Sequence, residues 1–85
     1  MLWSDESPIN VKEGRLVAIA VSAAIRCEYC IAAQIEFAKK AGANNEEIKA
    51  AIQIAAEIQR FSTLLYGNEF DADTFNKLIG RDNKE

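Results

Sequence analysis

The sequence of 85 residues contains no histidine. Chemistry at neutral pH must therefore proceed without an imidazole, the side chain that most often transfers protons in enzymes. The absence also weighs against a zinc site, because zinc normally needs four protein ligands, or three and a water. With 2 cysteines in the chain, a structural zinc could be completed only by sharing cysteines across a dimer.

The chain also lacks a basic stripe and a long hydrophobic run. Its 10 basic residues are scattered among 13 acidic ones and the net charge is −3, so we expect no nucleic-acid partner. The longest apolar run, residues 16–25, is about half as long as a membrane-spanning helix. The first residues lack the basic start and apolar stretch of a secretory signal. We therefore expect no membrane association and a reducing, cytoplasmic location.

The length and composition predict one domain, residues 1–85. With 49% hydrophobic and 27% charged residues the chain has a globular composition, and domains rarely divide below about 100 residues. A domain this small buries only about 60–65% of its unfolded surface, so its own core is thin. Association with copies of itself would bury more, and we expect a homo-oligomer.

Capping signals and hydrophobic spacing predict an all-α fold. Asn10 and Glu13 have the spacing of a capping box, and the apolar run that follows would need burial on all sides as a helix. Its valines and isoleucines also permit a buried strand, but its alanines favour a helix. The predicted helices cover about residues 10–25, 30–41 and 44–66, with a short one from Asp71 or Asp73 to Ile79 and a charged tail over 80–85.

The third predicted helix carries more apolar surface than one partner helix needs. Its apolar residues form two lines, one with Ile48, Ala51, Ile52 and Ala55, the other with Ile54, Ile58, Phe61 and Leu65. Either the helix is wholly internal to a small bundle, or one of the two lines faces a neighbouring subunit.

The two cysteines are spaced as Cys27-x-x-Cys30. On a helix these positions share a face, so the sulfurs are close enough to form a disulfide or share a metal. Gln34 lies one turn beyond Cys30 on that face. We expect the pair at the start of the second helix, where unpaired amides and the helix dipole favour a thiolate and lower its pKa from about 8.5.

Two thiols without further ligands suit redox exchange better than metal binding. Arg26, beside Cys27, and Arg15 could add positive potential, and Tyr29 could donate a hydrogen bond. The alternative is that both cysteines serve only as small buried apolar residues. Trp3 and Phe37 are expected to be packing or interface residues.

The residues from Arg15 to Gln34, with Ala38, the Ala41-Gly42-Ala43 turn and Glu46-Glu47-Ile48, resemble the core of the carboxymuconolactone decarboxylase family. Within that family they resemble the alkylhydroperoxidase AhpD branch, over about residues 10–70. The resemblance implies a small helical bundle of the AhpD-like type, completed by homo-oligomerisation into trimers or hexamers. It also implies a cysteine pair that reduces peroxides or exchanges with a partner disulfide.

The family pattern has a glutamate and a histidine at the positions occupied here by Arg15 and Gln34. Neither replacement can act as a general base near neutral pH, so the proton relay of the family is missing. Arg15 could instead favour a thiolate by charge, and Gln34 could donate a hydrogen bond to it. The resemblance implies Cys30 as the attacking thiol and Cys27 as the resolving one, an order that could be reversed.

These observations predict a CxxC-dependent thiol-disulfide redox protein with alkylhydroperoxidase or peroxiredoxin-type antioxidant activity. Its redox-active disulfide would replace a cofactor or metal, and a protein or small thiol would reduce it again. The alternative is a non-catalytic binding or assembly subunit with the same fold. A carboxymuconolactone-type decarboxylase is less favoured, because the chain has no histidine to move the proton.

Overall fold

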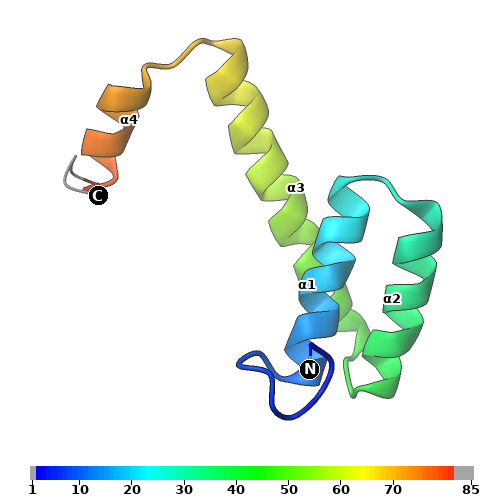
Figure 1. Ribbon diagram of the computed structural model, residues 1–85. Coiled ribbons are helices and arrows are strands. Elements are labelled where there is room, and N and C mark those ends of the chain that lie inside the picture. The colour runs from blue at the N-terminus through cyan, green and yellow to red at the C-terminus, as the bar shows by residue number, and fades with distance from the viewer. Residues whose placement is uncertain (1, 82–85) are drawn as a thin grey trace.

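The computed structural model of the protein describes residues 2–81. These residues form four helices, α1 (Val11–Ala24), α2 (Glu28–Lys40), α3 (Asn45–Gly67) and α4 (Ala72–Leu78), and no strand (Figure 1). The predicted all-α fold is confirmed, and the first apolar segment is a helix. Most of the predicted charged tail, from residue 82 on, lies outside the described residues.

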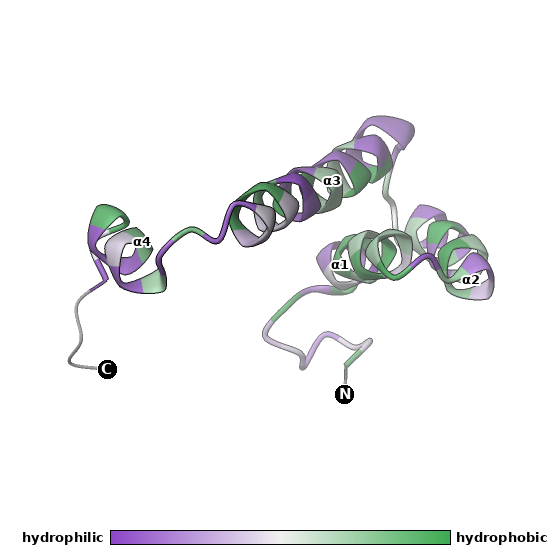
Figure 2. Cartoon of the chain, turned by 90° about the horizontal axis from the view of Figure 1, so that it is seen from above, coloured by the Kyte–Doolittle hydropathy of each residue, from purple (hydrophilic) through white to green (hydrophobic). Residues whose placement is uncertain are grey.

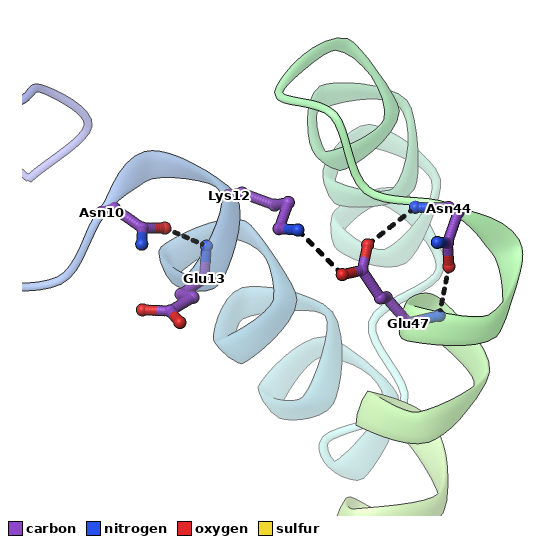
Figure 3. A network of polar contacts seen from close by, with 5 residues as sticks. All are labelled: Asn10, Lys12, Glu13, Asn44 and Glu47. Carbon is purple, nitrogen blue, oxygen red and sulfur yellow. Dashed lines mark hydrogen bonds and ion pairs between the residues drawn. The ribbon is translucent and has the colours of Figure 1, made fainter.

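Asparagine side chains cap α1 and α3 at the predicted positions. Oδ1 of Asn10 accepts a hydrogen bond from the Glu13 amide at 2.8 Å, and Oδ1 of Asn44 accepts one from the Glu47 amide at 2.8 Å. A full capping box forms at α3, where the Glu47 carboxylate accepts from the Asn44 amide at 2.9 Å. At α1 the Glu13 carboxylate points away from Asn10 (Figure 3), so only half of the predicted box is present.

One ion pair joins the starts of α1 and α3. Lys12 Nζ donates to Glu47 Oε2 at 2.8 Å, and both side chains are about one-third exposed (Figure 3). This hydrogen bond from Lys12, together with the one from the Asn44 amide, lowers the pKa of Glu47 below its ordinary value of 4.5. The same carboxylate therefore caps α3 and holds it against α1.

The core is small and lies around α1, which packs against both α2 and α3. Ile19, from the middle of α1, is fully buried. The other buried apolar residues are Ala38, Ala43, Ile48 and Ala51, with Leu16, Ile31 and Ile35 packed against them. Alanines make up much of this set, so the helices approach closely but remove little apolar area from water.

The second half of α3 extends beyond the unit formed by α1 and α2, and α4 lies apart from that unit (Figure 1). Hydrophobic and hydrophilic bands alternate along this part of α3 (Figure 2). Ile58 and Phe61, in this part of the helix, are 64% and 52% exposed. Within a single chain, α3 is therefore not wholly internal to a small bundle. That expectation is wrong for one copy of the chain. The radius of gyration, 16.1 Å, also exceeds the about 12 Å of a compact chain of this length.

Helix α1 is likewise not buried on all sides, which corrects the expectation drawn from its composition. Val17 and Val21 are 53% and 52% exposed. They line an open apolar groove of about 470 Å³ between α1 and α3, together with Ala50 and Ile54. Among the described residues, no helix combines the length and hydrophobicity needed to cross a bilayer.

The ion pair at Glu47 predicts a loss of stability in acid. A carboxylate whose pKa is lowered by folding stabilises the protein above its unfolded pKa, and that contribution is lost as the pH falls through the folded value. We expect the melting temperature of the wild type to fall below about pH 4.5 and the fall to be smaller in Glu47→Gln, measured by circular dichroism from about pH 3 to 7. Glu46→Gln, which changes an exposed neighbour, is the control. Equal acid sensitivity in the two variants would contradict this role of Glu47.

Candidate functional site

A tight turn between α1 and α2 places the first cysteine. The Cys27 amide donates to the Ser22 carbonyl at 3.0 Å and the Arg26 amide donates to the Ala23 carbonyl at 3.1 Å. These two bonds form a Schellman motif, which ends a helix with one residue in the left-handed region. That residue is Arg26, with φ at 58°, where glycine would adopt the conformation without strain.

Cys27 is the N-cap of α2 and is bonded to Cys30. Its sulfur accepts a hydrogen bond from the Cys30 amide at 3.2 Å, in the role that an asparagine or serine side chain usually fills. The two residues form a disulfide with their Cα atoms 5.2 Å apart, and both are partly buried. The prediction that the pair lies at the start of the second helix is confirmed. The positive end of the α2 dipole points at Cys27.

Arg15 and Gln34, which were separate candidates in the sequence, contact each other. Arg15 Nη1 donates to Gln34 Oε1 at 3.0 Å, across the interface of α1 and α2. Because guanidinium can only donate, this bond fixes the amide oxygen of Gln34 toward Arg15 and leaves the amide NH₂ as a donor. Gln34 lies one turn along α2 from Cys30, so this donor belongs to the same helix face as the cysteine.

Two aromatic rings lie against the Arg15 guanidinium, a contact that the sequence did not predict. The ring centroids of Trp3 and Phe37 are 3.7 Å and 4.6 Å from Arg15 Cζ. Trp3 reaches this position across Gly14, where an added Cβ would meet the indole at 3.3 Å. A glycine inside a helical pattern, next to an arginine, was the one local signal of this close approach.

The other two candidates, Tyr29 and Arg26, are exposed. Tyr29 is 85% exposed, and no hydrogen bond of its side chain is found within residues 2–81. The exposed Arg26 side chain donates to the Ala24 carbonyl at 3.2 Å. A shallow hollow lined by Arg26, Cys27 and Ile31 opens beside the pair. Within residues 2–81 no three histidine, cysteine, aspartate or glutamate side chains are grouped so that they could hold a metal ion.

The fold and the site together describe a small helical protein with a CxxC disulfide at a helix N-terminus. The sequence model of the Carboxymuconolactone decarboxylase family matches residues 1–70, so the chain belongs to that family. The chain is also 30% identical over 64 residues to a protein of Paracoccus denitrificans described as "Uncharacterized protein 4 in cox locus". That match covers 75% of this chain and 58% of the relative, so the chain spans little more than half of that protein. No solved structure matches the chain significantly.

The left-handed conformation of Arg26 predicts that glycine is more stable than alanine at this position. Arg26→Gly should raise the free energy of unfolding by about 1 kcal/mol relative to Arg26→Ala, because alanine keeps the strain of a Cβ at positive φ. Both variants remove the same charge and the same Ala24 contact, so the comparison isolates the backbone. Urea unfolding followed by circular dichroism measures the difference. Equal stability of the two variants would show that the turn relaxes when the arginine is removed.

Proposed function

We propose that the protein is a thiol-disulfide redox protein whose reactive groups are Cys27 and Cys30, working in a reducing cytoplasm. The observation that carries the proposal is the position of the pair. The Cys27 sulfur caps α2 and accepts a hydrogen bond from the Cys30 amide at 3.2 Å. An amide donor and the positive end of a helix dipole both stabilise a thiolate, the form of cysteine that attacks disulfides and peroxides.

The pair Arg15 and Gln34 supports anion stabilisation in place of a proton relay. Arginine stays protonated, and the amide NH₂ of Gln34 can donate but not accept. The chain contains no histidine that could act as a base. In this proposal the site therefore favours the thiolate at neutral pH by charge and hydrogen bonding, and the attacking sulfur needs no base to deprotonate it.

The proposed reaction with a hydroperoxide balances with the two cysteines alone. The thiolate of one cysteine attacks the terminal peroxide oxygen, the O–O bond breaks, and an alcohol leaves after taking a proton. The resulting sulfenic acid is attacked by the second thiol, which releases water and forms the Cys27–Cys30 disulfide. An external dithiol protein or small thiol then supplies two electrons and two protons to restore both thiols.

The order of attack follows from which sulfur carries the thiolate. The resemblance to the AhpD branch implies Cys30 as the attacking thiol and Cys27 as the resolving one. The hydrogen bond to Cys27 favours the opposite order, because it stabilises the anion on the sulfur at the N-cap. Single-cysteine variants separate the two orders.

The proposed site predicts one thiol with a pKa clearly below about 8.5 in the reduced protein. The rate of iodoacetamide alkylation should be measured against pH in Cys30→Ser, which retains Cys27, and in Cys27→Ser, which retains Cys30. The capping geometry predicts the lower pKa for Cys27, since its sulfur receives the amide hydrogen. A lower pKa for Cys30 would support the order implied by the resemblance.

The redox proposal itself is lost if both thiols react as slowly as free cysteine, or if peroxide forms no intramolecular disulfide in the wild type. Consumption of cumene hydroperoxide in the presence of dithiothreitol distinguishes a peroxidase from a protein limited to disulfide exchange. The double variant Cys27→Ser, Cys30→Ser is the control for background consumption.

A second candidate function is that of an assembly subunit, which the exposed apolar residues of α3 favour. Ile54, Ile58 and Phe61 are 63%, 64% and 52% exposed on a helix that extends beyond its own core. Apolar surface of this kind is typical of an interface. In both candidates we propose that copies of the chain cover it in a homo-oligomer, a trimer or hexamer as the family resemblance implies.

The α3 surface predicts that the protein is larger than its monomer mass of 9.4 kDa in solution. Ile58→Glu should reduce the mass measured by light scattering, because a charge would be buried without a partner at the interface. Gln53→Glu adds the same charge at another exposed position of α3 and should leave the mass unchanged. A wild-type mass equal to the monomer would contradict both the interface and the assembly role.

A further inference from the structure

Arg15 is a charged side chain held in place without a charged partner. It is partly buried in the interface of α1 and α2. The ion pairs among residues 2–81 join Lys12 to Glu47 and Arg60 to Glu57, and neither involves Arg15. Lys12, one turn earlier on α1, pairs with the carboxylate of Glu47. Among residues 2–81, no carboxylate pairs with Arg15.

The contacts of Arg15 fix its orientation but leave part of it free. Trp3 and Phe37 lie against the guanidinium at 3.7 Å and 4.6 Å, and one nitrogen donates to Gln34 at 3.0 Å. The other N–H groups of the guanidinium have no acceptor among the described residues. A guanidinium whose orientation is already set loses little conformational entropy when its free edge binds a ligand.

The N–H groups on the free edge of the Arg15 guanidinium indicate which kind of ligand would bind there. A planar guanidinium edge presents parallel N–H groups that match the two oxygens of a carboxylate, and such charge-assisted bonds are stronger than neutral ones. The rings beside Arg15 also offer apolar surface to the carbon skeleton of an organic ligand. Gln34 connects this position to Cys30, one helical turn or about 6 Å away along α2.

We propose that Arg15 is a substrate-binding residue that takes a carboxylate, so that the compound reacting with the Cys27–Cys30 pair is an organic acid carrying a disulfide or hydroperoxide group. Trp3 and Phe37 act as positioning residues that hold the guanidinium. This inference rests on the proposed redox function for its reaction, but the binding step stands on Arg15 alone and can be measured separately.

The kinetic test compares a charged and a neutral disulfide on the reduced protein. The probes are 5,5′-dithiobis(2-nitrobenzoate), which carries two carboxylates, and 4,4′-dithiodipyridine, which is neutral at pH 7. With either probe a cysteine thiolate attacks one sulfur and displaces an aromatic thiolate. The second cysteine then displaces the other and closes the Cys27–Cys30 disulfide, so the pair loses the two electrons that the probe gains.

We expect the ratio of the two rate constants, charged over neutral, to fall about tenfold in Arg15→Gln. A change in thiolate pKa alters both rates together and cancels in the ratio. Arg60→Gln removes the same charge from an exposed position on α3 and should change the ratio less than about twofold at about 0.1 M salt. An equal effect of the two variants would overturn the proposal while leaving the redox function in place.

The binding test does not require reactive thiols. Trp3 is the sole tryptophan of the chain and lies against Arg15, so its fluorescence reports on the site. Titration of the oxidised wild-type protein with succinate should give a saturable change, whereas neutral succinamide at matched ionic strength should give none. Arg15→Gln should lose the response and Arg60→Gln should keep it. A wild type that responds equally to both compounds, or to neither, would overturn the carboxylate site whether or not the cysteines prove reactive.

Discussion

The hydrogen bond from the Cys27 amide to the Ser22 carbonyl is the constraint on which the site depends. With its companion at Arg26 it ends α1 and reverses the chain within a few residues. The next residue, Cys27, then begins α2 as its N-cap. One turn therefore sets the pairing of α1 with α2 and brings a sulfur to a helix N-terminus. Arg26 occupies the left-handed position, so the turn forms despite the strain of a Cβ at positive φ.

The pairing of α1 with α2 also brings Arg15 to Gln34. In the family pattern these positions hold an acid and an imidazole, which can pass a proton between them. Here they hold two groups that do not titrate near neutral pH, joined by a hydrogen bond of 3.0 Å. The pair therefore offers a positive charge and hydrogen-bond donors, and no group that accepts a proton near neutral pH. A thiolate and a carboxylate are both anions, and the proposed roles of this pair rest on its positive charge and donors.

The size of the core explains why the chain leaves so much apolar surface outside. Among residues 2–81, Ile19 is the one large side chain that is fully buried, and its buried neighbours include three alanines. Close-packed alanines hold three helices together, but each alanine removes little apolar surface area from water. Apolar residues such as Val21 on α1 and Ile58 on α3 therefore remain half exposed or more. A second copy of the chain could supply the area that one copy lacks.

The local features of the fold were available from the sequence alone. Asn10, Asn44 and Asp71 begin helices because a side-chain cap needs only the next three residues, and the CxxC spacing located the disulfide for the same reason. The contact of Arg15 with Gln34 joins residues 19 positions apart, and that of Trp3 with Arg15 needs the N-terminal segment to fold back over Gly14. The first contact depends on how α1 crosses α2, and the second on where the N-terminal segment lies against α1. Only the tertiary structure could decide these two contacts, because spacing along one helix does not specify which residue of another segment that helix meets.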